Sequence, residues 1–194
     1  MVYFRVRNVR LDGKTGVTHK ASGDPMVTHL VHSLLRTQGY ACETALMRRA
    51  GGWNGSLRCW EDLELGVRIM SEARRRVYIP DVNVEVISRE DSVTGKDFAS
   101  KKGEWEKALD EMEKSLERGI NRHRDKWLRY VDYRRVILAA SYRHEGLKEE
   151  AAKLLRQALD SPRLNAVQRL YLRLAYAYTA AGGRGASIPA KFLF

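Results

Sequence analysis

Cysteine and proline are scarce in this chain of 194 residues, and long apolar runs are missing. The two cysteines are Cys42 and Cys59, and nothing demands that they pair, so we expect a reducing, cytoplasmic setting. No run of about 18 apolar residues occurs, so the sequence predicts no membrane-spanning helix. The first residues, MVYFRVRNVR, lack the apolar core and the cleavage site of a secretion signal.

Negative charge is in the minority, with 24 Asp+Glu against 35 Lys+Arg and a formal net charge of +11. This balance is compatible with a nucleic acid, an anionic membrane face or an anionic ligand such as a sugar nucleotide. The basic residues are dispersed, however, and only Arg74, Arg75 and Arg76 form a tight run. Because no nucleic-acid-binding motif accompanies them, we expect no nucleic-acid partner.

The hydrophobic pattern changes near residue 97, which predicts two regions. In residues 1–97, short extended segments alternate with helical ones, so we expect a mixed sheet with flanking helices, in the α+β or α/β class. The first expected strand, VYFRVRNVRL, places Val2, Phe4 and Val6 on one face. Residues 98–194 are expected to be almost entirely helical, with a loose tail, RGASIPAKFLF.

Four further segments complete the expectation for residues 1–97. Helices are expected at MVTHLVHSLLR, after Asp24-Pro25, and from about Trp60 to Glu72. The segment ACETALMRR is expected to be extended, and RRVYIPDVNVEVIS to form two short strands separated at Pro80-Asp81. His29 and His32 are expected to be ordinary surface or half-buried residues, because no third metal ligand is in sight.

The helical region carries a repeat. One expected helix buries a stripe of Trp105, Leu109, Met112 and Leu116, and further helices are expected near 130–145, 147–160 and 165–181. The segment LAASYRHEGLKEEAAKLLRQAL resembles a tetratricopeptide unit, and a period of 34 residues relates Leu138 to Leu172 and Tyr142 to Tyr176. The pattern departs at Arg135, where a Trp is usual, and at Pro162, and its matching positions are Leu138, Ala139, Tyr142, Gly146, Ala151, Leu155 and Ala158.

An acidic cluster, Glu61, Asp62 and Glu64, stands out in this basic chain. Acidic residues in the first turn of a helix complement its dipole, so the cluster could simply mark a helix start. Its surroundings suggest more. The stretch from Ala45 to Arg68, ALMRRAGGWNGSLRCWEDLELGVR, resembles the acceptor side of the catalytic domain in family-2 glycosyltransferases of the GT-A fold. The resemblance extends more diffusely over residues 2–97.

The resemblance implies roles for individual residues. Asp62 would be the general base that deprotonates an acceptor hydroxyl during an inverting transfer, with Glu61 shaping the site. Trp53 and Trp60 would stack on a sugar face, although core packing is an equal alternative for each. Gly52, after Gly51, would permit a tight turn. The resemblance also implies a role for Arg89. It stands where many relatives have a His, and its positive charge could pair with a diphosphate.

The resemblance also implies what this chain lacks. In the family, an N-terminal α/β half ends in a DxD-like motif whose carboxylates hold Mg²⁺ or Mn²⁺, and the chain contains no such motif before Asp62. We therefore expect the donor-binding half to be absent, the chain to bind no metal by itself and the isolated chain to be inactive. We also expect an exposed sheet edge where that half would pair, which favours self-association.

Two functional hypotheses lead, and a third, a basic nucleic-acid-binding adaptor, rests on the charge alone. In the first, the chain is the acceptor part of a glycosyltransferase that uses a nucleotide-sugar and a glycan or lipid-linked acceptor, and its charge would allow peripheral association with the inner face of a membrane. In the second, the chain is a non-catalytic module whose tetratricopeptide-like helices bind a protein partner, and the glycosyltransferase segment is a relic.

Overall fold

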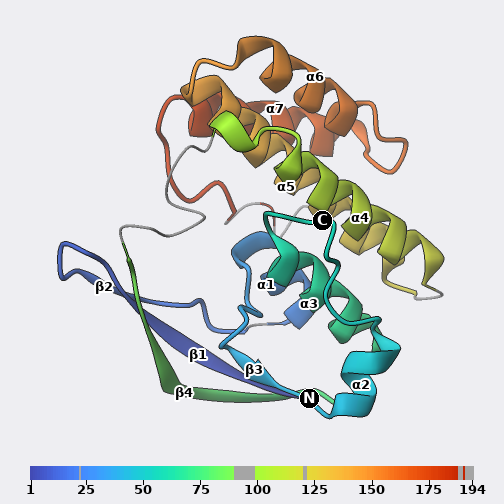
Figure 1. The fold of residues 1–194 in the computed structure, drawn as a ribbon. Coiled ribbons are helices and arrows are strands. Elements are labelled where there is room, and N and C mark those ends of the chain that lie inside the picture. Colours follow the sequence, from blue (N-terminus) through green and yellow to red (C-terminus); the bar gives the residue numbers. More distant parts are fainter. Residues whose placement is uncertain (22, 90–98, 120–121, 188–189, 191–194) are drawn as a thin grey trace. The chain divides into compact units, whose positions relative to one another are not determined.

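The computed structural model describes residues 1–21, 23–89, 99–119, 122–187 and 190 (Figure 1). The described chain is an α+β structure, and its contacts divide it into two compact units, Met1–Ser115 and Leu116–Phe194. The expected class of residues 1–97 is therefore confirmed at the level of α+β.

A small mixed sheet forms the base of the first unit. Its central strand, β1 (Val2–Val9), pairs in parallel with β4 (Val77–Ile87) along one edge. On the other edge, β2 (Thr15–Val17) and β3 (Tyr40–Ala41) pair antiparallel with opposite ends of β1. Helices α1 (Pro25–His32) and α3 (Glu61–Glu72) lie over one face of this sheet (Figure 1).

The expected alternation along β1 is wrong at Tyr3. Tyr3 and Val6 are the two fully buried side chains of this strand, although they lie three residues apart. The cause is an irregular register, because Phe4 pairs with Ile79 while Val6 already pairs with Val84. A bulge of this kind turns the side chains of one strand to a new face. The sequence pattern of β1 alone could not reveal a bulge in its partner.

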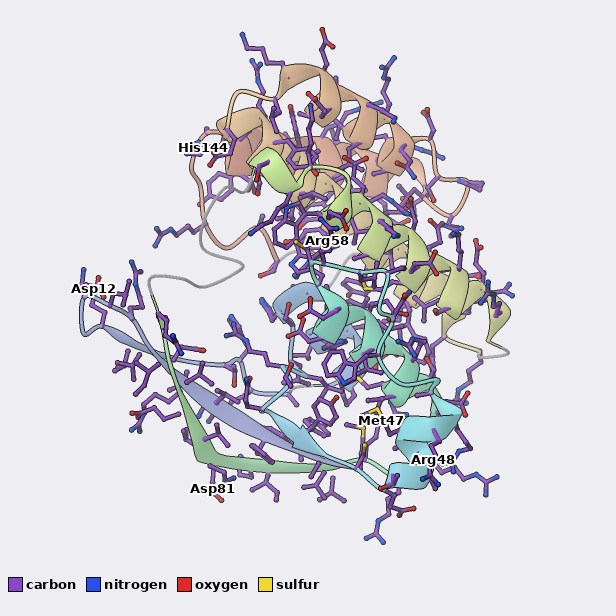
Figure 2. The ribbon with its side chains drawn as sticks, in the orientation of Figure 1. Asp12, Met47, Arg48, Arg58, Asp81 and His144 are labelled. Carbon is purple, nitrogen blue, oxygen red and sulfur yellow. The ribbon has the colours of Figure 1, made fainter. Side chains whose placement is uncertain are left out.

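The expected break at Pro80-Asp81 is also wrong. β4 runs without interruption from Val77 to Ile87, and Asp81 lies at its bend (Figure 2). The proline lies in the bulged part, opposite the register shift between Phe4 and Arg5. A bulge is one of the places where a strand tolerates a residue without an N–H donor.

Helix α1 begins where the sequence predicts it, but it ends at His32 and not at Arg36 as expected. The Asp24 side chain accepts a hydrogen bond from the Met26 backbone N at 3.0 Å, and Pro25 occupies the first helical position, as both residue types prefer. The helix is capped by Ser33, which adopts the left-handed conformation with φ 52° and donates its N–H to the His29 carbonyl.

The segment ACETALMRR is not extended as expected. Only Tyr40–Ala41 belong to a strand, and Thr44–Arg49 form helix α2. Ala, Leu, Met and Arg are strong helix formers, so local propensity favours this outcome. Leu46 anchors the helix against Leu65, Ile69 and Ala73, and Met47, labelled in Figure 2, packs against the same cluster.

The later helices form where they are expected, apart from the start of α5. They are α4 (Glu104–Arg118), α5 (Arg124–His144), α6 (Lys148–Leu159) and α7 (Ala166–Ala180). The α4 stripe of Trp105, Leu109, Met112 and Leu116 is buried, as predicted. Helix α5 starts earlier than expected because Trp127 already belongs to its buried face.

The second unit is built around α5, which packs against both α6 and α7. Gly146 closes the turn between α5 and α6 with φ 84°, a conformation that suits glycine. Most positions of the expected repeat are buried, but Leu154, not Leu155, is the fully buried leucine of α6. Arg135, at the position of the usual Trp, is buried and pairs with Asp132 at 3.6 Å.

Three tyrosine hydroxyls hold the segment that follows α7. Tyr178 donates to the carbonyl of Arg184 at 2.9 Å, Tyr171 donates to that of Ala186, and Tyr130 donates to that of Ala190 at 3.2 Å. In its described part, the tail is therefore bonded to the second unit rather than loose as expected.

Candidate functional site

The start of α3 has an unusual backbone. Trp60, the residue before the helix, adopts the left-handed conformation with φ 54°, which is uncommon for residues other than glycine. Its indole side chain accepts no hydrogen bond from the N–H groups of the first turn and so does not cap the helix. Glu61, Asp62 and Glu64 follow in the first turn, so the sequence prediction of an acidic helix start is correct. The three acids, however, have different surroundings.

Glu64 is engaged in an ion pair inside the first unit. Its side chain is only 2% exposed, and both of its oxygens accept hydrogen bonds at 2.6 Å from Arg68, one turn further along α3. The same guanidinium donates to the carbonyl of Ala50 at the end of α2. Glu64 therefore fixes the orientation of Arg68, which in turn joins α3 to α2.

Asp62 is half-buried, and among the described residues it forms no ion pair of this kind. Burial raises the pKa of its carboxyl above 3.8, and the neighbouring charge of Glu61 raises that pKa further. Hydrogen bonds from the backbone amides of Leu63 and Asp62, and the charge of Arg36, oppose this change without cancelling it. Asp62 also contributes to the raised pKa of Tyr40, after burial and Cys42, so this phenol lies within its electrostatic reach. A carboxylate with a raised pKa is a stronger base than an ordinary aspartate.

The two tryptophans differ in exposure. Trp53 is 46% exposed in the loop between α2 and α3. Trp60 is half-buried, and its ring meets that of Trp105 edge to face, with centroids 5.1 Å apart. Trp60 therefore packs against α4, whereas Trp53 has a surface to offer to a ligand. The sequence alone could not separate these two rings.

The remaining residues implied by the resemblance lie in turns and beyond a strand end. Gly51 and Gly52 follow α2 with φ values of 80° and 64°, so both occupy the left-handed region as the turn interpretation requires. Arg89 is exposed and lies two residues beyond Ile87, the end of β4.

The His29 side chain contacts the backbone of the first turn of α3. The expectation that His29 is a surface or half-buried residue is wrong. The ring is fully buried, with Nδ1 accepting from the Leu35 backbone N at 3.0 Å and Nε2 lying 2.8 Å from the Leu63 carbonyl oxygen. Because Nδ1 accepts, Nε2 carries the proton and donates it to Leu63, the residue that follows Asp62. His32 is half-buried as expected, and its ring stacks on that of His19 with centroids 3.7 Å apart.

No arrangement of three or more His, Cys, Asp or Glu side chains suitable for a metal ion occurs within the described residues. Among the helices described, none has the length and apolar character that crossing a membrane requires. No protein-family model, curated protein or solved structure matches the chain.

Proposed function

We propose that the first unit is the acceptor side of a family-2, GT-A-type glycosyltransferase and that Asp62 is its general base. The observation that carries this proposal is that Glu64 and Asp62, two members of the acidic cluster, have different surroundings. Glu64 is held by Arg68 at 2.6 Å, whereas the half-buried Asp62 has a raised pKa and, in the part of the chain that the structure describes, no salt bridge of that kind. The member that the family resemblance assigns as base is thus the one whose surroundings strengthen its basicity.

In the proposed reaction, a carboxylate oxygen of Asp62 accepts the proton of an acceptor hydroxyl. The hydroxyl oxygen attacks the anomeric carbon of a nucleotide-sugar while the bond from that carbon to the diphosphate breaks. A nucleoside diphosphate leaves, and the single displacement inverts the anomeric centre. Since the described residues offer no metal cluster, we assign the diphosphate and any Mg²⁺ or Mn²⁺ to a donor-binding half with a DxD-like motif.

The other proposed residues act around the base. Trp53 is exposed at 46% and offers an apolar ring face to the acceptor sugar. Glu61 keeps the pKa of Asp62 raised through its negative charge. Gly52 shapes the turn that carries Trp53, and Arg89 supplies positive charge toward a diphosphate. Trp60 serves by its contact with Trp105 rather than by stacking on sugar.

The first test determines the genomic DNA sequence upstream of the Met1 codon. Any open reading frame found there is then expressed together with this chain. An α/β segment that ends in a DxD-like motif supports the proposal, and unrelated sequence contradicts it. For the joined protein, release of nucleoside diphosphate should depend on an acceptor. The Asp62→Asn variant should lose activity by about 10²–10⁴-fold, the usual contribution of a general base. The matched variant Glu72→Gln, which changes an exposed acid at the end of α3, should retain most of the activity.

A second test uses the chain as it is. Oligosaccharides of several classes are titrated against the tryptophan fluorescence of the wild type and of the Trp53→Ala variant. Saturable binding that the variant loses supports an acceptor surface at Trp53. Binding that Trp53→Ala leaves unchanged places the sugar elsewhere and contradicts this part of the proposal.

A further inference from the structure

Helix α7 carries an exposed apolar stripe on the second unit. Val167, Leu170, Leu174 and Tyr178 are between 53% and 61% exposed. They recur at intervals of three and four residues, so they share one side of the helix over its whole length. The opposite side, with Leu172 and Ala175, is buried and is the side by which α7 joins the unit. The stripe is therefore additional to the residues that fold the helix.

A pocket continues the stripe at its C-terminal end. It has a volume of about 490 Å³ and lies between α7 and the segment of Arg184–Ala186 that the tyrosine hydroxyls hold. Leu174 and Tyr178 belong both to the stripe and to the pocket wall. A concave apolar site of this size is typical of ligand binding, and here it can receive a large apolar side chain.

The charged side chains of α7 and of the pocket wall are all positive. Arg173 is exposed and follows Leu170 by three residues, so it borders the stripe on α7. Arg184 is exposed and lines the pocket on the other side. No aspartate or glutamate follows Asp160 in the sequence, so neither α7 nor the pocket wall contributes an acidic side chain.

We propose that this stripe and its pocket dock an amphipathic helix of a partner protein, with acidic residues on both sides of its apolar face. The spacing of the stripe fits the apolar positions of a second helix laid along α7. The arginines on either side would meet the partner's carboxylates, and this pairing supplies specificity. The pocket would take one large apolar residue of the partner. This inference does not depend on the proposed glycosyl transfer.

The same charges argue against a second copy of the stripe as the occupant. Two α7 helices laid face to face would bring Arg173 and Arg184 of both copies together without a carboxylate from either stripe. Like charges in an interface oppose association.

The test measures binding of a fluorescent synthetic peptide to the full chain by anisotropy. The peptide is an amphipathic helix with leucines on one face and glutamates on both sides, and a matched peptide carries lysines in their place. Leu174→Gln removes an apolar side chain from the stripe, and Arg173→Glu reverses the sign of the charge at its border. Leu11→Gln and Arg156→Glu are the matched controls, because Leu11 is 65% exposed on the first unit and Arg156 is exposed on α6. Circular dichroism confirms that each variant is folded.

The proposal expects the glutamate peptide to bind and the lysine peptide to bind much more weakly. Leu174→Gln and Arg173→Glu should each weaken the affinity for the glutamate peptide by about tenfold or more, as for a residue at the centre of an interface. Both controls should leave this affinity unchanged. Arg173→Glu should also improve binding of the lysine peptide. Equal binding of the two peptides would overturn the proposal.

Two other results would also overturn it. A dimer in analytical ultracentrifugation that Leu174→Gln abolishes would show that a second copy covers the stripe. Flotation with vesicles of anionic lipid that Leu174→Gln abolishes, in the absence of peptide binding, would assign the stripe to a membrane surface.

Discussion

The ring of His29, on α1, packs directly on Gly66 of α3. A Cβ atom added at Gly66 would overlap the Nε2 and Cε1 atoms of the ring and would lie 3.2 Å from the Cβ of Leu35. The ring cannot move aside easily, because both of its nitrogens are hydrogen-bonded, to Leu35 and to Leu63. Glycine at position 66 is therefore what allows a histidine to support the first turn of α3.

We predict that Gly66→Ala destabilises the first unit by about 1–3 kcal/mol, as overpacking of a close contact does. Urea unfolding of the variant measures the change. Gly55→Ala is the matched control, because nothing lies within 4 Å of a Cβ at Gly55. In a double-mutant cycle, Gly66→Ala should cost less when His29 is already alanine. Additive costs would show that the two residues do not oppose one another.

The ion pair of Glu64 gives a second prediction. Glu64→Gln leaves Arg68 without its bidentate partner and should lower the free energy of unfolding by about 3–5 kcal/mol, as when a buried pair loses one member. Glu61→Gln, in the same turn, should change it by less than about 1 kcal/mol, because Glu61 is only partly buried and a solvated acid contributes little. Equal effects of the two variants would contradict the separate roles of the acidic residues.

Asp62 should limit stability at neutral pH. Its folded pKa is raised above 3.8, so the folded state binds this proton more tightly than the unfolded chain does. The resulting stability is fully present below pH 3.8 and is lost as the pH rises through the folded pKa. Asp62→Asn should therefore stabilise the protein by about 1 kcal/mol at pH 7, a size common for stabilising substitutions.

Thermal unfolding at several pH values measures this effect. The difference between wild type and Asp62→Asn should shrink as the pH falls and should vanish below pH 3.8, where aspartate is protonated in both states. A variant that is less stable than wild type at pH 7 would mean that the charge of Asp62 serves the fold. In that case the acidic cluster would be a helix start alone.

Alkaline pH should destabilise the second unit. Burial raises the pKa of Tyr171 to about 12 and raises that of Tyr133 as well, and their rings stack with centroids 6.5 Å apart. The stability that these neutral phenols provide is fully present below pH 10 and is lost as the pH rises through about 12. Tyr133→Phe, which removes one ionisable group, should move alkaline unfolding to higher pH. Phenolate absorbance and circular dichroism should change together, and tyrosine titration without loss of helix would contradict the prediction.

The parts of the fold that the sequence predicts are those set by local signals. Asp24-Pro25 starts α1, the acidic turn starts α3, and Gly146 separates α5 from α6. The parts that it does not predict depend on residues far apart in the chain. Tyr3 is buried because β4 bulges opposite β1. Periodicity within one strand cannot report the register of another.

The same distinction holds for the candidate site. The spacing of Glu64 and Arg68 is a local signal, since residues four apart on a helix are neighbours, and it could have identified their ion pair. The support of His29 under Leu63 could not be found in this way, because 34 positions separate them. Only the presence of a glycine inside α3 hinted that another group approaches closely there.

The tyrosine bonds to the segment after α7 affect which sequence changes the protein can accept. Each of these three bonds ends on a main-chain carbonyl, which every amino acid possesses, so the requirement falls on Tyr130, Tyr171 and Tyr178 and not on the residues they hold. Ala190 is an exception, since its methyl group is itself fully buried. Position 184 can therefore diverge among descendants of this gene without loosening the attachment. If its positive charge persists in them nevertheless, selection for recognition, and not for folding, would be the reason.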